Sequence, residues 1–204
     1  VYLMGGEISG NKGRGVDSTN GGVMINSGKI TGNGRNGVYL DGGTINMSGG
    51  EISGNYTALE ETEKYETHRG GGVWIAGGEF TMSGGEISGN LCDISENRGE
   101  ALGGGVYFAG SKMTVNGDAR ISGNTATKGG GVYFAGTTGM EMGGTASISG
   151  NHVNEAILTE ESRLEDGALG GGVYVEAGDL TIKDSVTITN NEAVSNQGRQ
   201  TPAG

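Results

Sequence analysis

A block of about 22 residues, repeated along nearly the whole chain, is the sequence feature that most constrains its fold. One copy reads GVYLDGGTINMSGGEISGN over residues 37–55, and the next reads GGGVWIAGGEFTMSGGEISGN over residues 70–90. Each copy closes on an asparagine: Asn11, Asn33, Asn55, Asn90, Asn124, Asn151 and Asn191. Self-similarity at such a period is typical of proteins that stack one structural unit per repeat. The chain is therefore predicted to be a solenoid.

The apolar residues inside each block recur with a period of two. Val73 and Ile75 flank Trp74, and Phe80 and Met82 flank Thr81. Alternation over short runs bounded by glycine is typical of half-buried strands. Alignment of the copies gives three apolar columns: Val16, Val38, Val73, Val106, Val132 and Val173; Leu3, Ile25, Met47, Met82, Val115, Met142 and Ile182; and Ile8, Ile30, Ile52, Ile87, Ile121, Ile148 and Ile188.

Three short strands per coil, joined by glycine-rich corners, predict an all-β, three-sided parallel β-helix of about six to seven coils. A right-handed sense follows from the general bias of parallel crossover connections. The chain has 46 glycines among its 204 residues, and only 33% of its residues are hydrophobic. This composition has too few apolar side chains for a globular core, but it suits a narrow core to which each coil contributes a few of them. Collagen is excluded because glycine does not occupy every third position.

Differences in coil length fall at one place, after the closing asparagine and before the next glycine run. The inserts are residues 56–69, 91–102, 125–128 and 152–169, and the three long ones carry eight of the eleven net negative charges. Both histidines, His68 and His152, lie in them. We expect the inserts to line one edge of the solenoid. This acidic edge and a pI near 4.6 argue against a nucleic-acid partner.

The solenoid is assigned to residues 1–191, and residues 192–204 to the start of a further coil or a flexible tail. Both ends cut through the repeat pattern, so we expect an excerpt of a longer array, in which further repeats of the same chain are partners of the end coils. No apolar run is long enough to span a bilayer. The single cysteine, Cys92, lies in an insert and has no partner for an internal disulfide.

One outward column is aromatic and is the candidate binding site. It holds Tyr39, Trp74, Tyr107, Tyr133 and Tyr174, with Asp17 at the equivalent position of an earlier coil. A row of exposed rings is suited to stacking on sugar faces. The alternative is that each ring stacks on the next, or that the inserts cover the rings, so that the column is structural.

Two other columns are polar. The closing asparagines are predicted to form a structural ladder, because each amide can bond to the amide of the next coil. A Ser/Thr column is flanked by an outward column that contains Glu7, Lys29 and Glu51. These charged and irregular neighbours argue against an ice-binding face and predict pairing between exposed charges of adjacent coils.

An enzyme is the less favoured interpretation. The best acid pair is Asp17 and Asp41, which adjacent coils place about 8 Å apart, a separation that suits an inverting glycosidase. The equivalent positions of later coils are Ala76, Ala109 and Ala135, so no cluster develops. The histidines lack zinc-ligand spacing, and no calcium nonapeptide repeat or Walker loop is present. No metal or cofactor is expected.

The motifs GGGVYF, FTMSGG and ISGN followed by TA resemble the repeats of bacterial surface β-helix proteins, including polymorphic outer-membrane proteins and adhesin-like proteins. The resemblance covers nearly all of the chain outside the inserts, but these motifs encode turns and core. It implies a secreted or surface-anchored stalk or passenger, often adhesive. We therefore expect a non-enzymatic, extracellular or cell-surface segment that displays acidic loops to a host surface or glycan. The alternative is a carbohydrate-binding or polysaccharide-degrading β-helix.

Overall fold

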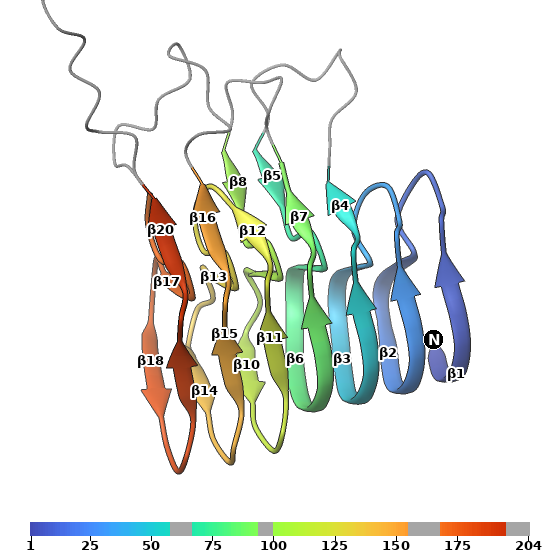
Figure 1. Cartoon of the computed structure of the whole chain (residues 1–204). Helices are drawn as coiled ribbons and strands as arrows, with labels where there is room; N and C mark the ends of the chain where they lie inside the picture. Colours follow the sequence, from blue (N-terminus) through green and yellow to red (C-terminus); the bar gives the residue numbers. More distant parts are fainter. Residues whose placement is uncertain (58–66, 94–99, 155–167, 195–204) are drawn as a thin grey trace, which may run out of the picture.

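The parallel β-helix predicted by the repeat is confirmed. The computed structural model describes residues 1–57, 67–93, 100–154 and 168–194, in which every regular element is a β-strand. All the strand pairs are parallel and join equivalent positions of successive coils. Figure 1 shows the coils stacked along one axis and winding in the right-handed sense.

The first coils are wound from long strands. These are β1 (Tyr2–Ser9), β2 (Val16–Thr31), β3 (Val38–Ser53) and β6 (Val73–Ser88). The last three have 16 residues each and run through all three faces of the coil without a break.

In the later coils each face has a strand of its own. The first face holds β9 (Val106–Phe108), β13 (Val132–Phe134) and β17 (Val173–Val175). The second face holds β10 (Lys112–Val115), β14 (Gly139–Met142) and β18 (Asp179–Ile182). The third face holds β11 (Arg120–Ser122), β15 (Ser147–Ser149) and β19 (Thr187–Thr189). The β6 strand pairs with β9, β10 and β11, so it connects the two kinds of coil in one sheet.

The corner between the second and third faces explains one of the two breaks in the later coils. In β6 this corner is residues 83–86, and at Gly85, where φ is 82°, a Cβ would lie 2.7 Å from the carbonyl oxygen of Gly50 in the coil before. Only glycine fits so tight a corner. The corner of the next coil, residues 116–120, is one residue longer, and the additional inward side chain is the buried Ala119.

The core is a narrow channel filled by inward columns. Ile25, Met47, Met82, Val115 and Met142 are at most 1% exposed along the second face. On the first face the rings of Phe108 and Phe134 stack with their centroids 5.3 Å apart. Burying one such side chain stabilises the fold by roughly 1.5–3 kcal/mol. The predicted apolar columns are therefore the core, except in the end coils, where Ile8 and Val173 are half-buried and Ile182 and Ile188 are exposed.

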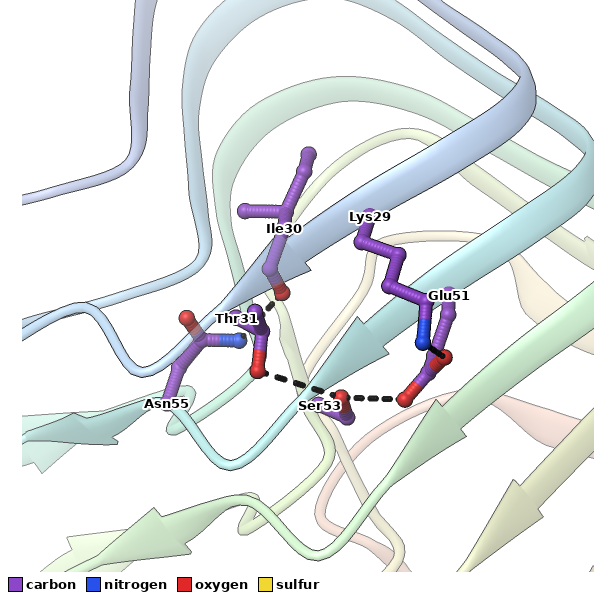
Figure 2. Close-up of polar contacts among 6 residues, drawn as sticks. All are labelled: Lys29, Ile30, Thr31, Glu51, Ser53 and Asn55. Atoms are coloured by element: carbon purple, nitrogen blue, oxygen red, sulfur yellow. Dashed lines mark hydrogen bonds and ion pairs between the residues drawn. The ribbon is translucent and has the colours of Figure 1, made fainter. Parts of the chain in front are cut away.

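The closing asparagines form a continuous buried ladder. The main-chain N and Nδ2 of Asn55 both donate to Oδ1 of Asn90, each at 3.0 Å. The same Nδ2 also donates to the carbonyl of Ile30 in the coil before, at 3.0 Å (Figure 2). This pattern recurs from Asn33 to Asn151, so each amide has both of its protons and its oxygen bonded.

The inserts begin and end in ordered strands. One accessory sheet contains β4 (Tyr56–Thr57), β7 (Leu91–Cys92), β12 (Thr125–Ala126), β16 (His152–Asn154) and β20 (Glu192–Val194). The other contains β5 (His68–Arg69) and β8 (Ala101–Leu102). Figure 1 shows these strands gathered at one end of the coil cross-section, opposite the tight turns that lead into β11 and β15. The described ends of all four inserts thus share one edge.

Asn36 closes these accessory sheets on the side of the first coils. Its side chain is 1% exposed, and Nδ2 donates to the carbonyl of Arg69 at 2.8 Å and to Oγ1 of Thr57 at 3.1 Å. The hydroxyl of Thr57 in turn donates to the carbonyl of Arg35 at 2.8 Å. The short connection that contains Asn36 therefore supplies a hydrogen-bond donor to a carbonyl of β5 in the next coil.

Candidate functional site

The aromatic column lies in register on the first face. The strand pairing places Asp17 beside Tyr39, Tyr39 beside Trp74, and Trp74 beside Tyr107. Tyr133 and Tyr174 continue the same column. The five rings identified in the sequence are thus brought together.

The rings mostly contact one another. Tyr39 and Trp74 meet edge to face at 4.8 Å, Tyr107 stacks on Tyr133 at 5.4 Å, and Tyr133 meets Tyr174 at 4.9 Å. Tyr107 and Tyr133 are only 8% and 4% exposed, because Leu102 from the end of an insert packs against them. Tyr39, Trp74 and Tyr174 are half-buried.

Two arginines occupy ring faces in this column. The guanidinium of Arg14 lies 3.8 Å from the centroid of Tyr39 and 5.4 Å from that of Trp74. Arg69 lies 5.9 Å from the centroid of Trp74 and 5.4 Å from that of Tyr107. Each such contact contributes about 0.5–2 kcal/mol. A sugar that stacked on these rings would have to displace a guanidinium or a neighbouring ring.

Burial also changes the pKa of the phenol of Tyr133, the central ring of the column. The apolar surroundings of Tyr133 raise the pKa of its phenol above the ordinary value, and the Glu176 carboxylate, which is hydrogen-bonded to it, acts in the same direction. Both effects disfavour the phenolate. The central part of the column is therefore neutral and packed rather than reactive.

Asp17 and Asp41 occupy different surroundings. The carboxylate of Asp17 is bonded to Nη1 of Arg14 at 2.7 Å, and its neighbour in the column is the ring of Tyr39. Asp41 pairs in register with Thr19 of the coil before, and it lies at an irregularity of the strand where Gly77 faces it in the coil after.

The described ends of the inserts carry several titratable side chains. His68 and Cys92 are buried, and burial raises the pKa of the Cys92 thiol. Lys128 pairs with Glu100 at 2.7 Å, and Nδ1 of the exposed His152 lies 3.5 Å from a carboxylate oxygen of Glu192. Within the described residues no group of three or more His, Cys, Asp or Glu side chains is placed to hold a metal ion.

The third face carries the Ser/Thr column and its charged neighbours. Figure 2 shows Nζ of Lys29 paired with Glu51 across adjacent coils, 3.1 Å apart, and Ser53 donating to the same carboxylate at 2.5 Å. The hydrogen bond from Ser53 is the larger cause, and Lys29 the next, of a Glu51 pKa below its ordinary value. The predicted pairing between exposed charges of adjacent coils is confirmed for this pair.

A groove on the second face is the feature that the sequence did not reveal. Its volume is about 560 Å³, and it lies over β10, β14 and β18. The polar lining residues are Glu79, Ser111, Lys112, Thr138, Glu141, Asp179 and Thr181. A second hollow of about 440 Å³ shares Glu141 and contains Lys183 and Asp184.

The groove exists because one residue of an outward-facing column, Gly139, has no side chain. Successive members of this column are Glu79, Lys112, Gly139 and Asp179. Gly139 has none, and the turn before it is one residue longer than in the coil before, which places the exposed Thr138 at the rim. The Thr138 hydroxyl donates to the carbonyl of Ser111, which joins two lining residues. In the sequence this is one glycine among 46, and its place between Lys112 and Asp179 is apparent only once the strand register is known.

Comparison with protein families, curated proteins and solved structures finds no match to this chain. The resemblance to polymorphic outer-membrane and adhesin-like repeats therefore stays a prediction. Among the residues that the structure describes, no helix has the length and apolar character needed to cross a bilayer.

Proposed function

We propose that the chain is a non-enzymatic, adhesin-like stalk segment of a secreted or cell-surface protein, in which a stiff solenoid holds acidic inserts out along one edge. The observation that carries this proposal is the anchoring of the inserts. Each long insert leaves from one accessory sheet, at β4, β7 or β16, and two of them return through β5 or β8. The ends of the first two long inserts therefore lie in adjacent coils, about 4.8 Å apart along the axis, whereas the third begins two coils further on, because β12 lies between β7 and β16.

The stacking supports a scaffold that tolerates variation at this edge. The asparagine ladder and the inward columns continue from coil to coil, although the connection from the closing asparagine to the next first-face valine varies from four residues (12–15) to 21 (152–172). Insertion at one corner leaves these repeating contacts intact, and variable loops on a rigid frame are a common arrangement for recognition. The acidic composition of the long inserts favours partners that are basic or that bind through hydroxyl groups.

The shortest insert of the chain, residues 125–128, is the template for shortening the three long inserts. In the shortest insert, Ala126 and Lys128 are joined by Thr127 alone, and they align with Cys92 and Leu102 of the coil before. Residues 58–68, 93–101 and 154–168 would each be replaced by one threonine, singly and together. We expect the triple variant to keep its far-UV circular dichroism spectrum while losing attachment to host cells and to immobilised glycans.

Single replacements serve as matched controls, because each removes one loop from the same scaffold. A graded loss across the three would identify the loop that binds. Unchanged attachment by a folded triple variant would remove the inserts from the function and contradict the proposal.

The second candidate function is carbohydrate binding, and the groove on the second face is the specific observation that favours it. Its lining of hydroxyls, carboxylates and one lysine offers both donors and acceptors to a polyhydroxy ligand. Its volume lies within the range of about 300–1,000 Å³ that is common for ligand sites. The aromatic column is less suited, because its ring faces already contact arginines and other rings.

A further inference from the structure

We propose that the groove over Gly139 is a binding site for a neutral oligosaccharide. This inference rests on the second candidate function above and assigns it a place, a ligand class and a residue on which binding depends. The groove lies on the second face, whereas the inserts leave from the accessory sheets. The two sites can therefore be tested separately.

The shape of the groove follows from the register of the column. Lys112 and Asp179 lie on the two coils on either side of Gly139, so their Cα atoms are about 10 Å apart along the axis. The space between them is unfilled because Gly139 has no side chain, and the buried Met113 and Met140 line its floor. A ligand entering the space lies across three coils.

The polar groups match sugar hydroxyls better than other ligands. Glu79 and Asp179 supply acceptors near the two ends of the groove, and Lys112 supplies a donor between them. The hydroxyls of Ser111 and Thr138 donate their protons to main-chain carbonyls and act as acceptors toward a ligand, and the hydroxyl of Thr181 acts as donor or acceptor. Carboxylates that accept from pairs of sugar hydroxyls form charge-assisted hydrogen bonds, which are stronger than neutral ones.

The net charge of the groove argues against an anionic glycan as its ligand. The groove is lined by three carboxylates, those of Glu79, Glu141 and Asp179, and by one ammonium, that of Lys112. The net negative charge repels uronate or sulfate groups. Glu141 is ion-paired with Lys183, which lowers the pKa of Glu141, so this carboxyl stays ionised and acts as an acceptor.

The key variant fills the space with a side chain. The φ of Gly139 is not in the left-handed region, and a Cβ there would lie 3.0 Å from the carbonyl oxygen of Asp179 and at least 3.7 Å from other atoms. Gly139→Gln therefore fits with a small adjustment and occupies the groove. Gly22 is the matched control, because it lies in the same column on an early coil, where the nearest atom to a Cβ is 3.8 Å away.

The experiment measures binding of cellotetraose, maltotetraose, mannotetraose and chitotetraose by calorimetry and by amide chemical-shift changes, with tetragalacturonate as the anionic comparison. We expect at least one neutral tetrasaccharide to bind, with shifts centred on Thr138, Gly139 and Thr181. Gly139→Gln should weaken its affinity at least tenfold, and Gly22→Gln should leave it unchanged. Asp179→Asn, which preserves shape, should weaken it several-fold, whereas Asp118→Asn on a nearby turn should not.

The outcomes separate the site from the function. Binding of a neutral sugar that is insensitive to both Gly139→Gln and Asp179→Asn would overturn this site while leaving carbohydrate binding in place. Failure of all four neutral sugars to bind at millimolar concentration would overturn both. Tighter binding of tetragalacturonate than of the neutral sugars would contradict the ligand class. If Gly139→Gln proves unfolded, Asp179→Asn decides alone.

Discussion

The coils before residue 56 and the coils after it share a core but differ on the outside. The earlier coils, here called the short-corner region (residues 1–55), have connections of four residues at 12–15 and 34–37. The later coils, the insert region (residues 56–194), add the accessory sheets at the same edge. Asn33 in one region and Asn124 in the other nevertheless make the same ladder of bonds. Stacking is thus set by the inward and ladder columns, whatever the connection.

The difference appears in the aromatic column. In the insert region Leu102 covers Tyr107 and Tyr133, which become buried. In the short-corner region no insert end is present, and the ring of Tyr39 is half-buried with Arg14 of a short connection on its face. The same column therefore holds buried rings in the middle of the insert region and half-buried rings at Tyr39, Trp74 and Tyr174. The surroundings of an outward column depend on the corner beside it.

The largest expected effect tests whether the ladder is common to both regions. Asn33→Ala and Asn124→Ala each leave buried main-chain groups without partners, and each should lower the free energy of unfolding by about 3 kcal/mol or more. Urea unfolding followed by circular dichroism measures the loss. Asn46→Ala, on the exposed surface of β3, is the control and should change stability by less than about 0.5 kcal/mol. A much smaller loss for Asn33 than for Asn124 would show that the two regions are not held in the same way.

A smaller effect should distinguish the regions. Tyr133→Leu removes a buried ring between two others and should cost about 2–3 kcal/mol, whereas Tyr39→Leu, at the half-buried end of the column, should cost about 1 kcal/mol. Equal losses in urea unfolding would contradict the division into a covered and an uncovered part.

The ionisation of the Tyr133 phenol, in the insert region, makes the stability of the protein depend on pH. Because its folded-state pKa is raised, the folded state retains its proton where the unfolded state has lost it. The stabilisation is complete below the ordinary value of 10.0 and is lost as the pH rises through the folded pKa. Absorbance titration should show a late-ionising tyrosine that disappears in Tyr133→Phe. A wild-type titration identical to that of this variant would rule out the raised pKa.

The architecture was predictable because its determinants are local and repeated. An alternating run such as Val73–Trp74–Ile75 fixes which side chains point inward, and a one-residue slip would expose every apolar side chain of the strand. Six copies of this run and seven closing asparagines leave few other folds. The accessory strands were not predictable, because β4 and β7 have two residues each and no alternation to recognise.

The candidate sites were harder to find because they depend on contacts between coils. The aromatic column was identified from alignment, but its cover by Leu102 and its arginine partners come from connections of unequal length. The groove depends on a missing side chain at Gly139, and in a chain with 46 glycines one further glycine carries no visible signal. Only the paired register of Lys112, Gly139 and Asp179 reveals the space.

The smallest expected effect compares one exposed ion pair from each region. Lys29 pairs with Glu51 in the short-corner region, and Lys183 pairs with Glu141 in the insert region. The pKa of both carboxyls is lowered, but by different leading causes, which are the hydrogen bond from Ser53 for Glu51 and the contact with Lys183 for Glu141. Both contributions to stability are present above the ordinary value of 4.5 and are lost as the pH falls through the folded pKa.

The effect of salt on stability should further distinguish the two ion pairs. Glu51→Gln should lower the free energy of unfolding at pH 7 by about 0.5 kcal/mol or less, because the pair is largely exposed. High salt should remove little of this loss, since Ser53 remains a donor to the native carboxylate but salt screens only the attraction to Lys29. Glu141→Gln should have a smaller effect that vanishes in 1 M NaCl. Urea unfolding at pH 3 and pH 7, in low and high salt, measures both. A larger and salt-resistant loss at Glu141 would reverse the ranking and show that the insert region depends more on its surface charges than the short-corner region does.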